Sequence, residues 1–186
     1  TPFVAKEGEE WQSYARDTKK LARKHALPGT KGLEHRVGGL EKEDITGNIS
    51  YEPENHEKMC FLRAKKVERV ADFISKQKIY GDESGDLLVI GWGGTYGSLY
   101  TSVKELREEG KKVSLAHFNY INPLPKNTAE IFKNFKNIVV CELNNGQFVD
   151  LLKSKHDTFQ FKQFNHIQGL PFKTTDLKEH FNTLIS

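Results

Sequence analysis

From Asp86 onward, short apolar runs alternate with segments in which apolar residues recur every three or four positions. The runs are typical of strands buried on both faces, and the spaced pattern is typical of amphipathic helices. Strands and helices in alternation predict a three-layer α/β/α domain with a mostly parallel sheet, which we place at residues 81–186. The predicted strands are 86–92, 111–121, 136–144 and part of 159–167, and the predicted helices are 97–110, 126–135, 145–156 and 174–185.

A longer amphipathic pattern precedes this domain. Met59, Leu62, Val70 and Phe73 recur at helical spacing, with charged residues between them. Pro53 suits the first turn of a helix, because the missing N–H of proline has no partner there. The pattern predicts a helix over residues 54–75, within a connecting segment of residues 53–80.

The first 52 residues follow neither period for long, and they hold five of the glycines between Gly29 and Gly47. A segment of this length without regular structure indicates a linker, or an arm that lies on a partner. We therefore interpret residues 1–52 as an extended, glycine-rich arm. Within it, the basic piece YARDTKKLARKHA could form a turn or two of helix.

Composition narrows the function classes. The 186 residues carry a net charge of +3, and the mean hydropathy is −0.62 with 28% charged residues. No window approaches the roughly 20 apolar residues of a membrane helix, and the basic residues are too interspersed to indicate nucleic-acid binding. We expect a cytoplasmic protein without a membrane or nucleic acid as partner. Cys60 and Cys141 form no C-x-x-C pair, so the cysteines predict no disulfide, zinc or iron–sulfur site.

The turn GWGGTYG after the first predicted strand is one candidate site. A dinucleotide fingerprint, G-x-G-x-x-G, needs a third glycine three residues after the second. Gly91 and Gly93 fit the first two positions, but Tyr96 occupies the third and Gly97 comes one residue late. The following strand also ends without an acidic residue for a ribose. These departures favour a strand-to-helix turn that needs small residues over a nucleotide site.

The segment GLEHR in the arm is a second candidate, because it places Glu34, His35 and Arg36 side by side. Histidine exchanges protons near neutral pH, and arginine binds a carboxylate or phosphate through two parallel hydrogen bonds. Composition alone favours a solvated surface loop. If any residues of this chain reach a substrate, we expect them to be His35 and Arg36, and we predict no catalytic, cofactor-binding or metal-binding residue.

A third candidate lies where the strand predicted at 136–144 ends. Glu142 and Asn144 would lie at the carboxyl end of a strand, where open α/β sheets bind ligands. Alternatively, Asn144 or Asn145 caps the following helix, and both interpretations stay open. Cys141 follows apolar residues and is interpreted as a small buried hydrophobe. The seven histidines lack the spacing of metal ligands, so no metal site is predicted.

Several segments together resemble one family. GLEHRVGGLEKEDITGNISYEPENHEKM, LLVIGWGGTYGSLYTSVKELREEGKKV, NPLPKN, CELNNGQ and QGLPFK are similar to the carboxy-terminal region of alpha subunits of 2-oxoacid:ferredoxin oxidoreductases. The 2-oxoglutarate type is the most similar, and the resemblance covers nearly the whole chain in order. It implies a domain like the carboxy-terminal domain of transketolase, preceded by the irregular arm and the long helix.

The resemblance also implies what the complex does. The family decarboxylates a 2-oxoacid on thiamine diphosphate with Mg²⁺, passes electrons through an iron–sulfur cluster to ferredoxin, and transfers the acyl group to coenzyme A. This chain lacks a G-D-G…N segment and the cysteines of a cluster. We therefore expect it to bind none of these cofactors alone and to be inactive by itself.

The expected role is structural. As a carboxy-terminal fragment of the alpha subunit, the chain would dock the beta subunit and the upstream domains of its own subunit, and would meet ferredoxin only through the complex. Transketolase-like proteins are dimers, so a homo-oligomer is expected as well. The alternative from another class is a free-standing nucleotide- or flavin-binding Rossmann-like module.

Overall fold

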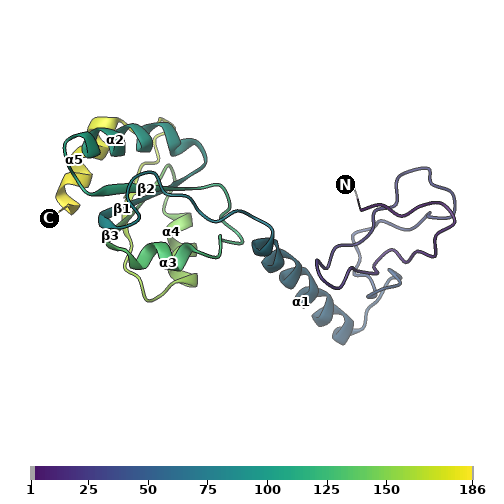
Figure 1. Cartoon of the computed structure of the whole chain (residues 1–186). Coiled ribbons are helices and arrows are strands. Elements are labelled where there is room, and N and C mark those ends of the chain that lie inside the picture. Colours follow the sequence, from purple (N-terminus) through teal and green to yellow (C-terminus); the bar gives the residue numbers. More distant parts are fainter. Residues whose placement is uncertain (1–2, 186) are drawn as a thin grey trace. The chain divides into compact units, whose positions relative to one another are not determined.

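The computed structural model describes residues 3–185, which divide into two compact units (Figure 1). The first unit extends to Phe73, and the second begins at Ile74. The first contains the arm and helix α1 (Pro53–Arg69), followed by the short 3-10 helix η1 (Val70–Asp72). The predicted helix over 54–75 is therefore present but ends earlier, and its last turn is tightened.

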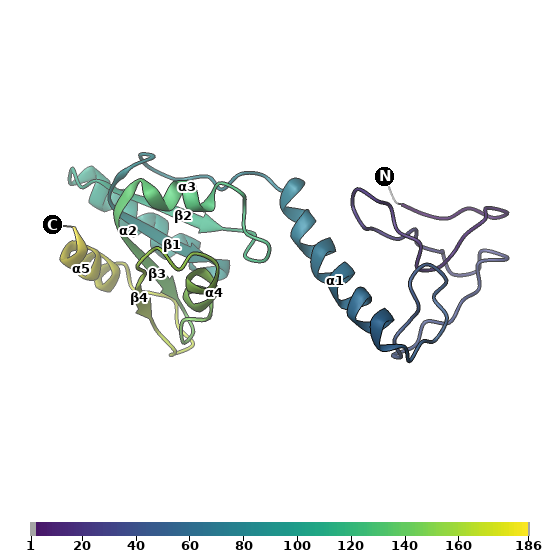
Figure 2. The ribbon, with the colours of Figure 1, turned by 90° about the horizontal axis from the view of Figure 1, so that it is seen from below.

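The second unit is built on a four-stranded sheet whose strands all run parallel, in the order β2-β1-β3-β4 (Figure 2). The chain leaves β1 toward one side of the sheet and passes from β3 toward the other, so β1 and β3 flank the point where the strand order reverses. The strands are β1 (Gly85–Trp92), β2 (Val113–Phe118), β3 (Phe135–Glu142) and β4 (Lys162–Asn165); the helices are η2 (Gly93–Thr95), α2 (Tyr96–Glu108), α3 (Thr128–Lys133), α4 (Gln147–Lys155) and α5 (Thr174–Leu184).

Helices cover both faces of this sheet, which confirms the predicted three-layer α/β/α fold (Figure 1). α2 and α5 pack on the face that receives Leu87 and Val89 of β1. α3 and α4 pack on the opposite face, which receives Leu88 and Ile90. Successive side chains of a strand point to opposite faces, so an unbroken apolar run supplies both cores. Each such side chain, fully buried, contributes roughly 1.5–3 kcal/mol.

The segment before β1 covers one edge of the sheet. Tyr80 exchanges two backbone hydrogen bonds of 2.9 Å with Leu115 of the edge strand β2. The ring of Tyr80 also packs on Tyr100 of α2, with the ring centroids 4.6 Å apart. Residues 74–80 therefore belong structurally to the second unit.

The arm contains no helix and no strand longer than a single bridge within residues 3–52. The expectation of a short helix in YARDTKKLARKHA is wrong. Arg16 and Arg23 instead form an antiparallel bridge around a tight turn. The side chain of Asp17 accepts hydrogen bonds from the backbone N–H groups of Lys19 and Lys20, and this local bonding competes with a helix.

The first unit has almost no hydrophobic core. Among the described residues, only three buried apolar side chains belong to it, Ala5, Leu33 and Met59, against 26 in the second unit. Polar contacts hold the arm on α1 instead. Asn55 of α1 pairs with the arm backbone, donating to the carbonyl of Lys42 at 2.9 Å and accepting from the N–H of Asp44 at 3.0 Å.

Candidate functional site

An open hollow of about 660 Å³ lies in the first unit around the segment GLEHR. The structure places His35 and Arg36 on the same hollow, together with Glu34 and, from distant parts of the arm, Trp11 and Asn48. The arm thus brings the predicted pair into a surface depression that three separate stretches line, although each residue of the pair is itself exposed.

The orientation of His35 is fixed locally. Its Nδ1 lies 3.0 Å from the carbonyl oxygen of Leu33, and the Trp11 ring meets the imidazole edge-on at 4.8 Å. A carbonyl only accepts, so Nδ1 carries the proton that it donates, and Nε2 is left to accept from another group. Within residues 3–185, the guanidinium of Arg36 makes no hydrogen bond or ion pair. The pair can therefore offer a cationic fork and an acceptor to a ligand.

The carboxyl edge of the sheet is occupied by a capping arrangement. Glu142 is fully buried at the end of β3, and its carboxylate accepts hydrogen bonds from the backbone N–H groups of Phe148 and Val149 in the first turn of α4. The indole Nε1 of Trp92, at the end of β1, donates to the same carboxylate at 3.1 Å. Negative charge at a helix N-terminus is favourable, so Glu142 joins the two central strands to α4.

Asn144 has a capping role as well. Its Oδ1 accepts hydrogen bonds from the backbone N–H groups of Gly146 and Gln147, and its Nδ2 donates to Glu142. Of the two interpretations left open for this segment, capping is the one that the geometry supports. Cys141 is fully buried beside it, and burial raises the pKa of its thiol above the ordinary range, as expected for a small hydrophobe.

The glycine turn has a packing role. A Cβ at Gly91 would lie 2.2 Å from Leu99 Cδ1, so a larger residue here would have to displace the buried Leu99 side chain between α2 and β1. Gly93 has φ +59°, in the left-handed region that glycine adopts without strain. Thr95 closes the turn by donating to the carbonyl of Trp92 at 2.9 Å. These contacts support the interpretation of a strand-to-helix turn.

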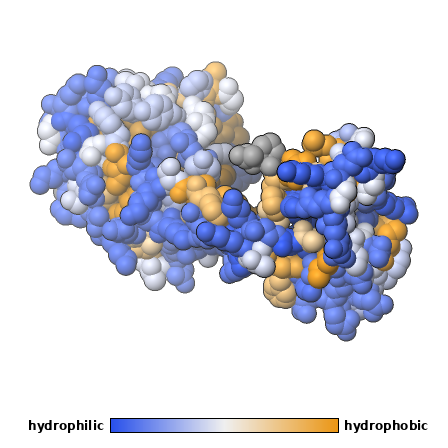
Figure 3. Space-filling model, turned by 45° about the vertical axis from the view of Figure 1, so that its right-hand side comes forward, coloured by the Kyte–Doolittle hydropathy of each residue, from blue (hydrophilic) through white to orange (hydrophobic). Residues whose placement is uncertain are grey.

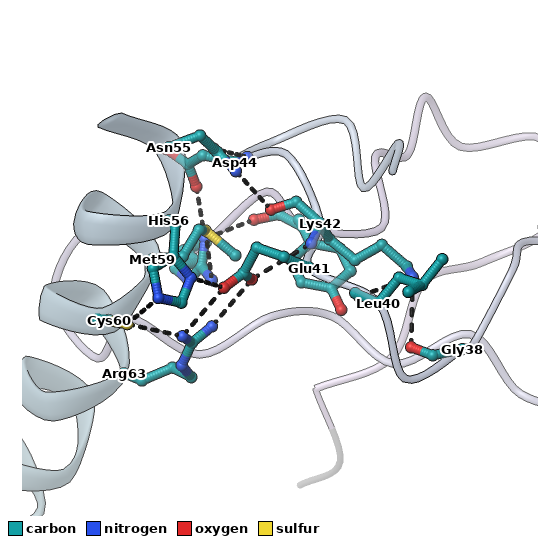
Figure 4. Close-up of polar contacts among 12 residues, drawn as sticks. Gly38, Leu40, Glu41, Lys42, Asp44, Asn55, His56, Met59, Cys60 and Arg63 are labelled. Carbon is teal, nitrogen blue, oxygen red and sulfur yellow. Dashed lines mark hydrogen bonds and ion pairs between the residues drawn. The ribbon is translucent and has the colours of Figure 1, made fainter. Parts of the chain in front are cut away.

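A cluster that sequence patterns did not indicate lies between the arm and α1 (Figure 4). Glu41 of the arm accepts two hydrogen bonds from Arg63, at 3.1 and 3.3 Å, and a third from Nδ1 of His56 at 2.7 Å. Arg63 foremost, and then His56, lower the pKa of the Glu41 carboxyl to about 2. His56 and Cys60 are four residues apart on one helix face, which is the only sequence signal; the participation of Glu41 depends on the fold of the arm.

Comparison with known families decides where the chain belongs. Residues 85–179 match the family model described as pyruvate:ferredoxin oxidoreductase core domain II. The chain belongs to this family. The matched region runs from the first residue of β1 into α5, so it covers the α/β unit.

Relatives of core domain II extend the similarity into the arm. The chain is 40% identical over 175 residues to the 2-oxoglutarate oxidoreductase subunit KorA of Mycobacterium tuberculosis, covering 93% of this chain and 26% of that protein. It is 27% identical over 150 residues to the 2-oxoacid:ferredoxin oxidoreductase subunit alpha of Saccharolobus solfataricus, covering 78% of this chain and 24% of that protein. The chain therefore spans about a quarter of the length of these curated relatives.

A solved structure is similar across both units. The 2-oxoglutarate:ferredoxin oxidoreductase from Magnetococcus marinus, determined with 2-oxoglutarate, coenzyme A and succinyl-CoA bound, matches with a TM-score of 0.86 and 25% identity. The match covers 98% of this chain and 32% of the solved chain. These matches support the main interpretation over a free-standing nucleotide-binding module.

The two cysteines of this chain are not placed to hold an iron–sulfur cluster. Such clusters are held by several thiolates, whereas Cys60 and Cys141 lie in different units and Cys141 is sealed in the core. Within residues 3–185, no group of three histidine, cysteine or acidic side chains is arranged to hold a metal ion. The same part of the chain has no helix long and apolar enough to cross a bilayer.

Proposed function

We propose that this chain is part of the alpha subunit of a cytoplasmic 2-oxoglutarate:ferredoxin oxidoreductase, and that its own role is to assemble the enzyme around its active site. The observation that carries the proposal is that the first unit exposes many more large apolar side chains than it buries. Ten of the 15 exposed large apolar side chains lie in residues 3–73, which bury only three apolar side chains. Figure 3 shows hydrophobic residues on the visible face of this unit. A surface of this kind is stabilised when another surface covers it.

The covering surfaces are then the upstream domains of the same subunit and a beta subunit. Copies of this alpha–beta pair would associate as a homo-oligomer, and ferredoxin would bind to the assembled complex. The choice of 2-oxoglutarate over other 2-oxoacids rests on the relatives, since KorA is more similar to this chain than the alpha subunit from Saccharolobus solfataricus is. Thiamine diphosphate with Mg²⁺, the iron–sulfur cluster and coenzyme A would be bound by the rest of the complex. Within residues 3–185, the cysteines and acidic groups are not arranged to hold the cluster or the Mg²⁺.

His35 and Arg36 are the residues of this chain that we place nearest to the substrate. Arg36 has no partner within residues 3–185 and lines an open hollow, so it is free to bind a carboxylate or phosphate through two hydrogen bonds. His35 has its Nδ1 engaged and its Nε2 available on the same hollow. The pair would hold an anionic group of the substrate and would take no part in bond breaking.

The activity is tested with the whole reading frame that contains this chain, co-expressed anaerobically with the adjacent beta subunit. Reduction of ferredoxin or a viologen dye is followed with 2-oxoglutarate and coenzyme A, each omitted in turn. Reduction that requires both is the expected result. A folded complex, loaded with thiamine diphosphate and cluster, that reduces nothing with any 2-oxoacid would contradict the proposal.

The binding role is tested in the same enzyme by His35→Ala with Arg36→Ala. We expect the apparent KM for the anionic ligand to rise about tenfold or more, because a charge-assisted bidentate contact contributes roughly 1.5–3 kcal/mol. Lys31→Ala, which removes an exposed charge of the same loop outside the hollow, is the matched control. Unchanged turnover and KM in the double variant would eliminate this role.

A further inference from the structure

Cys60 lies on the exposed face of α1 between two basic side chains that contact its sulfur (Figure 4). His56, one turn earlier, places Nε2 at 3.7 Å from the Cys60 Sγ. Arg63, one turn later, places Nη2 at 3.1 Å from the same sulfur. A base and a fixed cation beside a thiol are the two features that turn a cysteine into a nucleophile.

The base is itself oriented. Nδ1 of His56 lies 2.7 Å from a Glu41 oxygen, and a carboxylate accepts, so the proton of the neutral imidazole belongs on Nδ1. Nε2 is then the acceptor that faces the thiol. Nucleophile, base and orienting carboxylate thus follow one another as Cys60, His56 and Glu41, which is the geometric order of cysteine-based nucleophilic sites.

An independent observation points to the charge of the reagent. Arg63 also lines a hollow of about 510 Å³, which we call the cationic hollow, together with Arg16, Arg23 and Lys66. Glu41 is the one carboxylate among its lining residues. Arg16 is paired with Asp44 and Arg63 with Glu41, whereas Arg23 and Lys66 have no carboxylate partner within residues 3–185. This excess of cations around a concave surface favours an anionic ligand.

A buried cation adds to this field. Lys42 is only 2% exposed, and its Nζ donates to the carbonyl oxygens of Gly38 and Leu40, which line the cationic hollow. Within residues 3–185 it forms no ion pair with a carboxylate. A buried charge without a counter-charge is costly, and an anion bound in the adjacent hollow would offset that cost.

We propose that Cys60 is a modification site that exchanges with anionic, low-molecular-weight disulfides held in the cationic hollow. The thiol proton passes to Nε2 of His56, and the Cys60 thiolate attacks one sulfur of the disulfide. The disulfide S–S bond breaks as the new one forms, and the released thiolate takes up the proton from His56. Cys60 is oxidised to a mixed disulfide while the departing half is reduced to a thiol, so one disulfide is exchanged for another.

The proposal does not depend on the enzyme's substrate, and it is tested in the intact complex at pH 7. Oxidised glutathione is the anionic probe, and hydroxyethyl disulfide is its neutral counterpart. Modification is followed by mass spectrometry of the peptides that contain Cys60 and Cys141. We expect Cys60 to react with oxidised glutathione about tenfold faster than a free thiol does, whereas the buried Cys141 stays unmodified until the protein unfolds.

Two variants separate the base from the hollow. His56→Gln is expected to slow the reaction of Cys60 with both disulfides about tenfold, whereas Lys66→Gln with Arg23→Gln slows only the reaction with oxidised glutathione. Glu57→Gln, an exposed change on the same helix, should alter neither rate. A Cys60 that stays unmodified, that reacts no faster than a free thiol, or whose rates are the same in all variants would overturn the proposal.

Discussion

The fully buried Glu142 accepts four hydrogen bonds, from the side chains of Trp92 and Asn144 and from the backbone N–H groups of Phe148 and Val149. Its partners come from β1, from the turn after β3 and from α4. One carboxylate therefore fixes the end of the sheet to the start of a helix. Removing it would leave several buried donors without an acceptor, and each such donor is costly.

The first prediction follows at this scale. Glu142→Ala should lower the free energy of unfolding by about 3 kcal/mol, because unsatisfied buried donors cost more than the hydrogen bonds themselves contribute. Urea denaturation of the whole protein, followed by tryptophan fluorescence, measures the change. Glu179→Ala removes an exposed glutamate on α5 and should change stability by less than about 0.5 kcal/mol. Equal effects would show that Glu142 does not have this role.

Single residues were the least predictable part of the chain. Asn144 could be recognised as a cap, because its partners follow within three residues. The role of Glu142 could not, because Trp92 is 50 positions away and meets it only after β1 and β3 pair. At Asp17 the sequence led to a wrong prediction. The basic and apolar residues around it suggested a helix, but the Asp17 side chain accepts hydrogen bonds from the local backbone and so competes with that helix.

At the scale of elements, the turn between β1 and α2 offers a matched pair of glycines. Gly91→Ala would place a Cβ 2.2 Å from Leu99 Cδ1 and 2.8 Å from Thr95 Oγ1, so we expect a loss of about 1–3 kcal/mol from overpacking. At Gly97, in the first turn of α2, a Cβ would meet nothing within 4 Å. Gly97→Ala should stabilise the protein by about 0.5–1 kcal/mol. Thermal unfolding of both variants checks the pair, and losses of similar size would contradict it.

The contact between the arm and α1 should depend on pH. Because the folded-state pKa of Glu41 is about 2, below the ordinary 4.5, its ion pairs contribute fully above pH 4.5. That contribution is lost as the pH falls from 4.5 toward 2, when the carboxyl is protonated. The protection factors of the amides in residues 38–44, which are corrected for the intrinsic pH dependence of exchange, should therefore fall over this range.

Glu41→Gln is the control for this pH dependence, because it removes the titrating group and keeps the side-chain shape. The variant should show low protection factors in residues 38–44 at every pH, with little change between pH 4.5 and 2. Protection factors in the wild-type arm that stay constant across the same range would contradict the role assigned to Glu41.

The strands and helices of the second unit could be predicted from the sequence. A strand that is buried on both faces is a continuous apolar run, whereas a helix that is buried on one face has apolar residues at every third or fourth position. The end of α1 could not be fixed, since Val70 and Phe73 continue the apolar spacing beyond Arg69. The apolar residues of the arm recur with neither the helix nor the strand period, so its local structure could not be predicted. Its backbone is held by isolated bridges and by side chains such as Asn55, whose pairing emerges only in three dimensions.

At the scale of the whole molecule, the two units differ in how they are stabilised. The second has two apolar cores, one on each side of the sheet. The first has polar contacts and an exposed apolar surface, to which Val37 and Tyr51 contribute strongly, at 86% and 82% exposed. The first unit is therefore the part that a covering surface would stabilise most.

Val37→Ser with Tyr51→Ser should lower the fraction of alpha subunit recovered with the beta subunit, or the temperature at which the intact enzyme loses activity. The expected loss is a few kcal/mol of association, since burial of each side chain contributes roughly 1.5–3 kcal/mol. Ile167→Ser changes a comparably exposed apolar residue, 68% exposed, of the second unit and should have no such effect. If the double variant assembles as the wild type does, this surface has no role in subunit docking.

The bridge between Tyr80 and Leu115 has a consequence for solubility. An open sheet presents unpaired N–H and C=O groups at its outer strands, and these are templates on which strands from other molecules can add. At β2, Tyr80 already uses both backbone groups of Leu115, so an incoming strand would have to displace it first. At the other side, β4 is only four residues long. Both outer strands of the sheet are therefore protected against the addition of strands from other molecules, and this protection limits aggregation of the newly made chain.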